Sequence, residues 1–305
     1  MQKIINILRN RNTILVMSIV LGLTVGDIAH SIKHLTFYIL AFVLSFSTTG
    51  IATSEFSAKK DMFTYPLYGF LLNYVLFSAV LLPVAYFLSP SKEIFYGFVI
   101  IAATPPGVAV IPFSYMLGGN LKKSILGTLG GFLASILVTP LMIKLFTGEE
   151  SMSFFELFMN MIKIILIPLL LSRVLLTKPL KNFTTKVRGN VVNWGFAVII
   201  FTAVGINRGV LLSDYVLVLD VALIFFIGIF VLGQAFDIIS RKMGMKSDDS
   251  MSFNLLLTIK SSGFSVVTAI AIFNNSAVVP SAVMSIFVLL YLLFLTFQKS
   301  YRERK

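Results

Sequence analysis

The sequence lacks cysteine, contains two histidines and one tryptophan in 305 residues, and is only 12% charged. The absence of cysteine excludes disulfides, thiolate nucleophiles and thiolate metal sites, and leaves the redox compartment undetermined. The histidines, His30 and His34, lie together between two apolar segments, and no Asp or Glu lies in the middle of such a segment. An intramembrane hydrolase and a Schiff-base protein are therefore disfavoured, because each needs such groups within its spans. We predict no enzymatic activity, metal or cofactor.

Long apolar runs dominate the chain, which is 57% hydrophobic with a mean hydropathy of +0.93. This composition is typical of an all-α polytopic membrane protein embedded in a lipid bilayer. About 20 apolar residues cross a bilayer as a helix. Ten segments suit this template, at residues 13–31, 34–53, 64–88, 94–117, 124–146, 154–176, 190–207, 215–238, 251–273 and 278–298.

Basic residues are distributed unevenly between the predicted loops, with most of them on the side that also carries both termini. Because positive charge marks cytoplasmic loops, both termini are predicted to be cytoplasmic, in a protein of the cell membrane. The net charge of +12 then reflects topology, and nucleic acid is not a predicted partner. The basic start and the apolar run that follows resemble a secretory signal, but cleavage would leave nine spans.

Five spans in residues 1–150 followed by five in 151–305 predict two inverted repeats, the plan of many secondary transporters. The fourth span carries Ala102 to Pro112, AATPPGVAVIP, which should break the helix near Thr104 to Gly107. The ninth carries small residues at the equivalent place. The two breaks should cross at the bilayer midplane and form a site. The alternative is that these residues only permit close helix packing. The candidate site residues are Thr104, Pro105, Pro106, Gly107, Thr258, Lys260, Ser261, Ser262 and Gly263.

Several motifs resemble those of the bile acid:sodium symporters, with auxin efflux carriers as more distant relatives. Three of them also match that family in spacing: Ala102–Gly107, Gly119-Asn120 and Thr139-Pro140. The others are Ser47–Ile51 up to Phe56, Ile167–Leu169 up to Arg173, and Ser261–Phe264. The resemblance implies a panel of helices 1, 2, 6 and 7, a core of helices 3, 4, 5, 8, 9 and 10, and sodium-driven transport of organic anions.

The chain departs from this family at the positions that the resemblance assigns to sodium ligands. They are occupied by Ser78, Val110, Ile111, Phe132, Leu256 and Lys260. Hard cations need several oxygen ligands, usually with a carboxylate. Five of these six side chains offer no oxygen, so we predict transport without sodium and no metal site.

Lys260 lies about nine residues, or roughly 13 Å, from either end of its span. A charged lysine there costs about 2.5–3.5 kcal/mol, so it should face a polar cavity or partner. Three roles stay open. In the first, Lys260 titrates and couples transport to protons, because burial disfavours the charged ammonium. In the second, it pairs with an anionic substrate. In the third, it is a fixed charge that holds the two half-helices together. Further lining candidates are Asn73, Ser78, Val110, Ile111, Thr128, Phe132 and Asn193.

The sequence thus predicts a secondary active transporter of a small organic anion that works by alternating access, with Lys260 in place of sodium. The alternatives are a conventional sodium-coupled symporter, an uncoupled facilitator and a channel. Substrate identity, transport direction and oligomeric state do not follow from the sequence.

Overall fold

The computed structural model describes residues 11–50, 61–107, 109–148, 153–273 and 275–303. Every regular element in these ranges is a helix, apart from one isolated β-bridge between Pro106 and Lys260. Seven of the described helical stretches are long and apolar enough to cross a membrane. The protein is therefore an all-α polytopic membrane protein, as predicted.

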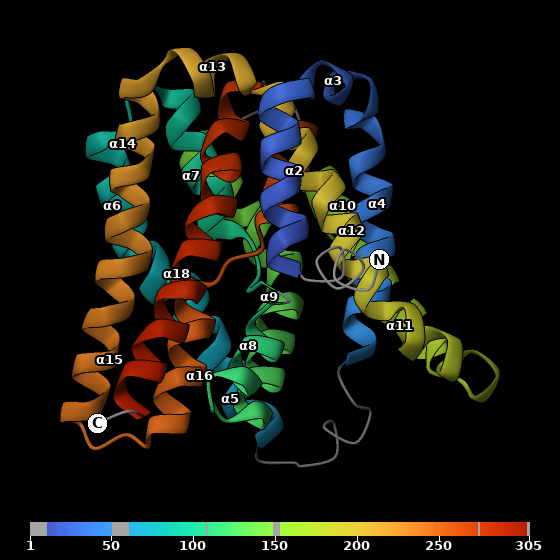
Figure 1. Cartoon of the computed structure of the whole chain (residues 1–305), viewed down its shortest axis with the longest axis vertical. Coiled ribbons are helices and arrows are strands. Elements are labelled where there is room, and N and C mark those ends of the chain that lie inside the picture. The colour runs from blue at the N-terminus through green and yellow to red at the C-terminus, as the bar shows by residue number, and fades with distance from the viewer. Residues whose placement is uncertain (1–10, 51–60, 108, 149–152, 274, 304–305) are drawn as a thin grey trace.

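The first part of the chain runs back and forth between the two ends of the bundle (Figure 1). Its elements are α2 (Arg11–Val25), η1 (Gly26–Ile28), α3 (Ala29–Ile32), η2 (Lys33–Leu35), α4 (Thr36–Ser47), η3 (Thr48–Gly50), α5 (Asp61–Phe70), η5 (Leu71–Leu76), α6 (Phe77–Leu88), α7 (Lys92–Ala103), α8 (Val110–Met116) and α9 (Leu121–Thr147). Short polar caps set the helix starts, since Ser91 accepts from the Ile94 amide and Asn120 from the Lys123 amide.

The second part repeats this alternation of direction. Its elements are α10 (Phe154–Met161), η6 (Ile162–Leu166), α11 (Ile167–Leu175), α12 (Lys178–Ile206), α13 (Arg208–Ser213), α14 (Tyr215–Phe225), η7 (Phe226–Val231), α15 (Leu232–Lys242), α16 (Ser247–Thr258), α17 (Ser262–Ile272), η8 (Asn275–Val278) and α18 (Val279–Glu303). Ser153 and Glu156 form a capping box at the start of α10.

One helix is much longer than the apolar pattern predicts. α12 begins at Lys178, whereas the predicted span begins at residue 190. The additional residues are mostly polar, and Pro179 occupies the first turn, where a proline is tolerated. An apolar window locates the part of a helix that suits the bilayer and not the end of the helix itself.

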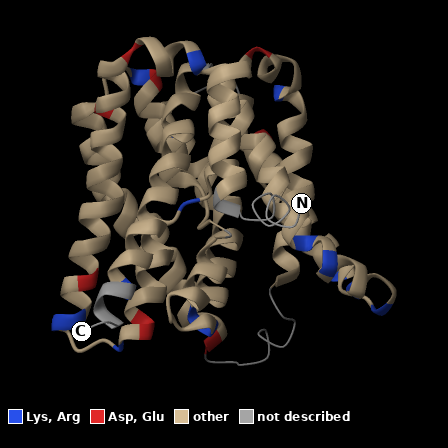
Figure 2. Cartoon of the chain, in the orientation of Figure 1, with Lys and Arg blue, Asp and Glu red and all other residues tan. Residues whose placement is uncertain are grey.

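The interior is formed mainly by two large, adjoining apolar clusters. One joins α6, α7, α14, α16 and α18, and the other joins α4, α12 and α17. Charged residues gather at the two ends of the bundle and around the turn between α11 and α12 (Figure 2). This distribution leaves an apolar belt around the middle, as a bilayer requires.

Candidate functional site

The helix that carries Pro-Pro-Gly stops at Ala103, one residue before the predicted break, and Thr104 is extended at φ −77° and ψ 152°. α8 resumes the path at Val110. The second interruption separates α16, which ends at Thr258, from α17, which begins at Ser262. Both interruptions lie within the stretches that the sequence singled out.

The two interruptions meet and supply each other with backbone hydrogen bonds. The Gly107 amide donates to the Ile259 carbonyl at 2.7 Å, and the Ser261 amide donates to the Pro105 carbonyl at 3.0 Å. This antiparallel contact, which we call the crossover, comprises Thr104–Gly107 and Ile259–Ser261. Backbone groups freed within a membrane protein need internal partners, and here each break partly satisfies the other.

Close packing holds the crossover against α9. A Cβ atom built on Gly131 would lie 2.3 Å from Cδ of Pro106, so no larger residue fits there without a shift. Gly107 is similarly confined, with its Cβ position 3.0 Å from the Lys260 carbonyl oxygen. The crossover is therefore enclosed by packed backbone.

Lys260 is buried at 2% exposure, and its ammonium is bound by main-chain oxygens. Nζ donates to the Asn73 carbonyl at 3.0 Å and to the Ala102 carbonyl at 2.9 Å. It also lies 4.9 Å from the ring centre of Tyr74 and 5.0 Å from that of Phe77, within the range of a cation–π interaction. Among the described residues, no ion pair involves this ammonium.

Both carbonyls that bind Lys260 lack their usual helical donor. In an α-helix the Ala102 carbonyl would accept from residue 106, which is proline and has no N–H. The Asn73 carbonyl would accept from the Phe77 amide, but in the π-helix η5 that amide donates to Leu72 instead. Lys260 thus replaces two missing backbone donors.

Other orphan carbonyls at the end of α7 also find side-chain donors. Thr139 on α9 donates to the Ala103 carbonyl at 2.7 Å, and Asn73 Nδ2 donates to the Thr104 carbonyl at 3.0 Å. Asn73 therefore lies at the crossover. Ser78 is buried, and its hydroxyl has no partner among the described residues. Both Asn73 and Ser78 were predicted to line the site, but of the two only Asn73 hydrogen-bonds to the crossover among the described residues.

The remaining crossover candidates have separate environments. The Thr258 hydroxyl donates to the Asn254 carbonyl one turn earlier at 2.7 Å. The buried Ser261 hydroxyl has no partner in the described part of the chain. Ser262 borders a cavity of about 40 Å³, and Gly263 packs against the ring of Phe196.

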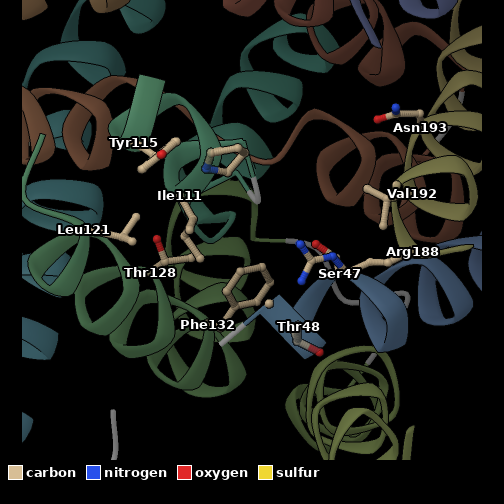
Figure 3. A pocket seen from close by; sticks show the side chains of 13 residues that line it. Ser47, Thr48, Ile111, Tyr115, Leu121, Thr128, Phe132, Arg188, Val192 and Asn193 are labelled. Carbon is tan, nitrogen blue, oxygen red and sulfur yellow. The ribbon is translucent and has the colours of Figure 1, made fainter. Parts of the chain in front are cut away.

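A sizeable cavity lies beside the crossover and not within it. It has a volume of about 450 Å³ and lies between α4, η3 and α12 on one side and α8 and α9 on the other. Figure 3 shows its side chains converging from both sides. The lining residues are Ser47, Thr48, Gly50, Ile111, Pro112, Tyr115, Leu121, Thr128, Phe132, Arg188, Gly189, Val192 and Asn193.

Four predicted lining residues border this cavity: Ile111, Thr128, Phe132 and Asn193. Val110 instead is fully buried in the apolar cluster around α7, as is Leu256 at the position of the expected carboxylate. The sequence missed Arg188, which it assigned to a cytoplasmic loop because the predicted span began two residues later. Arg188 lies five residues before Asn193, about 140° away around a helix, so the helical period did not indicate that both border one cavity.

Membrane-spanning helices, two interrupted helices that meet in the interior and a cavity beside them define a polytopic integral membrane protein built like a transporter. The sequence profile of the Sodium Bile acid symporter family matches residues 14–213, and the chain belongs to this family. The family is named for symporters, which agrees with the prediction of a transporter and not an enzyme.

One curated relative is the Arabidopsis thaliana protein named "Probable sodium/metabolite cotransporter BASS1, chloroplastic". The two sequences are 26% identical over 234 residues, which cover 75% of this chain and 57% of the relative. The chain thus spans a little over half the length of that protein.

Proposed function

We infer that the protein is a secondary active transporter that moves a small organic anion across a membrane by alternating access, without sodium. Family membership and the name of the plant relative, a sodium/metabolite cotransporter, support transport of a small metabolite. The names of the family and of the plant relative both include sodium, whereas we infer that this chain transports without it. The chemistry of the crossover supports sodium independence.

Ten membrane segments in two inverted repeats, 1–150 and 151–305, are part of this proposal. One of the seven long stretches, Thr13–Gly50, contains two antiparallel helices in Figure 1, α2 and α4, and so counts as two segments. The two interrupted helices are not among the seven and complete the ten. Two matches between the halves support the repeat. Asp61–Leu88 and Tyr215–Lys242 each have 28 residues and a central π-helix, and α7 and α16 each have 12 residues before their breaks.

The position of the cavity supports alternating access. One wall comes from α4, η3 and α12, which belong to the proposed panel, and the other from α8 and α9, which belong to the proposed core. A shift of core against panel would open the cavity to one side and then the other. The N-terminal ends of the interrupted helices carry partial positive charge, which favours an anion.

The observation that carries sodium independence is the binding of the Lys260 ammonium by two carbonyls that lack helical donors. A fixed cation there supplies the positive charge that a sodium ion would bring. Valine, phenylalanine and leucine at other expected ligand positions offer no side-chain oxygen. Bound lysine and absent ligands both argue against a sodium site.

The contacts of Lys260 favour a fixed charge over direct pairing with substrate, because the side chain does not border the 450 Å³ cavity. Proton coupling through Lys260 is a separate hypothesis. Lys260→Gln tests it in reconstituted vesicles: pH-dependent transport that disappears while substrate binding persists would support coupling, whereas an unchanged pH profile would contradict it.

Counterflow in proteoliposomes tests the transport function. Vesicles preloaded with one organic monocarboxylate from a panel should accumulate the same labelled compound transiently and saturably, equally in NaCl and in KCl. Saturable counterflow excludes a channel. Accumulation that needs sodium would make the protein a conventional symporter, and the absence of counterflow across the panel would contradict the proposal.

A further inference from the structure

The cavity between panel and core contains one cationic residue among its described lining residues, Arg188 on α12. Its guanidinium reaches into the cavity beside Ser47 (Figure 3). It also lies over the backbone of Gly50, where an added Cβ would be 3.1 Å from Nη1. Glycine at this position leaves space for the guanidinium. Within the described ranges, the ion pairs involve other residues and leave the charge of Arg188 uncompensated.

Other polar side chains line the same cavity. Ser47 and Thr48 lie on the panel wall with Arg188, and Asn193 is about one and a half turns from it along α12. Thr128 borders the cavity from α9. Hydroxyl and amide groups can supply further hydrogen bonds to an anion that the guanidinium binds.

The rest of the cavity wall is mainly apolar. Ile111 and Pro112 come from α8, and Leu121 and Phe132 from α9. The panel side therefore offers one charge and several polar atoms, and the core side is mainly hydrocarbon, with the hydroxyls of Tyr115 and Thr128 as its polar groups. A ligand that matches both sides has one anionic end and an apolar body.

We propose that Arg188 is the anion anchor of the substrate site and that it restricts the substrate to organic monoanions with an apolar body. A guanidinium can bind one carboxylate through two parallel hydrogen bonds, which lysine cannot reproduce. A second negative charge would face the apolar wall without a partner, which is costly. This inference rests on the proposed transport function and assigns its charge recognition to the panel and not to the enclosed crossover.

Ligand-induced stabilisation of the purified full-length protein tests the assignment. The probes are phenylacetate, its neutral amide phenylacetamide, and the dianion 1,4-phenylenediacetate. A ligand that binds the folded state raises the thermal midpoint by mass action. The variants are Arg188→Gln and Arg188→Lys, with Lys186→Gln as the matched control, since Lys186 is an exposed residue of the same helix outside the cavity lining.

We expect phenylacetate to stabilise the wild type and the control, with the amide and the dianion much weaker. Arg188→Gln should weaken phenylacetate binding about 10- to 100-fold, the usual range for a lost hydrogen bond to a charged group, and Arg188→Lys should retain part of it. Equal binding in Arg188→Gln, or equal binding of acid and amide, would overturn the assignment. So would a wild type that phenylacetate fails to stabilise.

Counterflow of the same probe separates this inference from the proposed function. Transport by the wild type that persists at the same apparent affinity in Arg188→Gln would refute the anchor while leaving the transporter intact. Arg188-dependent binding without transport would refute the transporter while leaving the anion site intact.

Discussion

Replacing Lys260 with methionine should destabilise the protein, although it removes a buried charge. The substitution keeps most of the side-chain volume but removes both donors, at 3.0 Å and 2.9 Å from their carbonyl oxygens. Neither carbonyl has its usual α-helical donor, because Pro106 has no N–H and the Phe77 amide donates to Leu72. A buried unsatisfied acceptor costs about 1–3 kcal/mol, so two cost roughly 2–6 kcal/mol.

The opposing effect is relief from burying an ammonium, which costs several kcal/mol when the charge is unpaired. Here two carbonyls and two aromatic faces already offset much of that cost, so we expect a net loss of at least about 2 kcal/mol. At about 2–4 °C per kcal/mol, the thermal midpoint of Lys260→Met should fall by about 4 °C or more. Ser78→Ala is the control, because it removes a buried hydroxyl that has no partner in the described residues. A midpoint for Lys260→Met at or above the wild-type value would refute this reasoning.

Three further predictions concern the crossover. Gly131→Ala should destabilise the protein by about 1–3 kcal/mol, because the added Cβ would overlap Pro106. Gly209→Ala is the control, since no atom lies within 4 Å of its Cβ position, and it should be neutral or stabilising. The thermal midpoints of the two variants test this difference. Thr139→Val should cost about 1–3 kcal/mol by removing the donor to an orphan carbonyl of α7, and a midpoint equal to wild type would count against that accounting. Lys260→Ala leaves only two carbonyl oxygens at the position of the ammonium, too few for a sodium site, so its thermal midpoint should be the same in NaCl and in KCl; a rise in NaCl alone would count against the argument from absent ligands.

Local chemistry made the breaks predictable. A proline pair followed by glycine stops a helix wherever it lies, so the end of α7 at Ala103 followed from the residues themselves. The acceptor at Ala102 was also accessible to sequence reasoning, because residue 106 is a proline and cannot donate to it. The Asn73 carbonyl could not be predicted as an acceptor for Lys260, since it loses its usual α-helical donor only in a π-helix, which the period of apolar residues does not indicate.

The cavity was less predictable because two of its walls come from distant parts of the chain. Ile111 and Phe132 were expected there as replaced sodium ligands, and the structure places them on its wall for a different reason, apolar contact. Arg188 was overlooked because an apolar window of α12 begins after it, although the helix itself continues back to Lys178. Hydropathy locates the bilayer-facing part of a helix but gives no account of charged residues just beyond it.

The thermal midpoint of the purified wild-type protein in NaCl, matched against KCl at equal ionic strength, tests sodium independence most directly. A sodium ion bound only by the folded protein would stabilise it by about 2.7 kcal/mol at 100 times its Kd. With Lys260 occupying the cation position, the two salt titrations should coincide. A saturable rise in NaCl that KCl does not produce would demonstrate a sodium site and contradict the account.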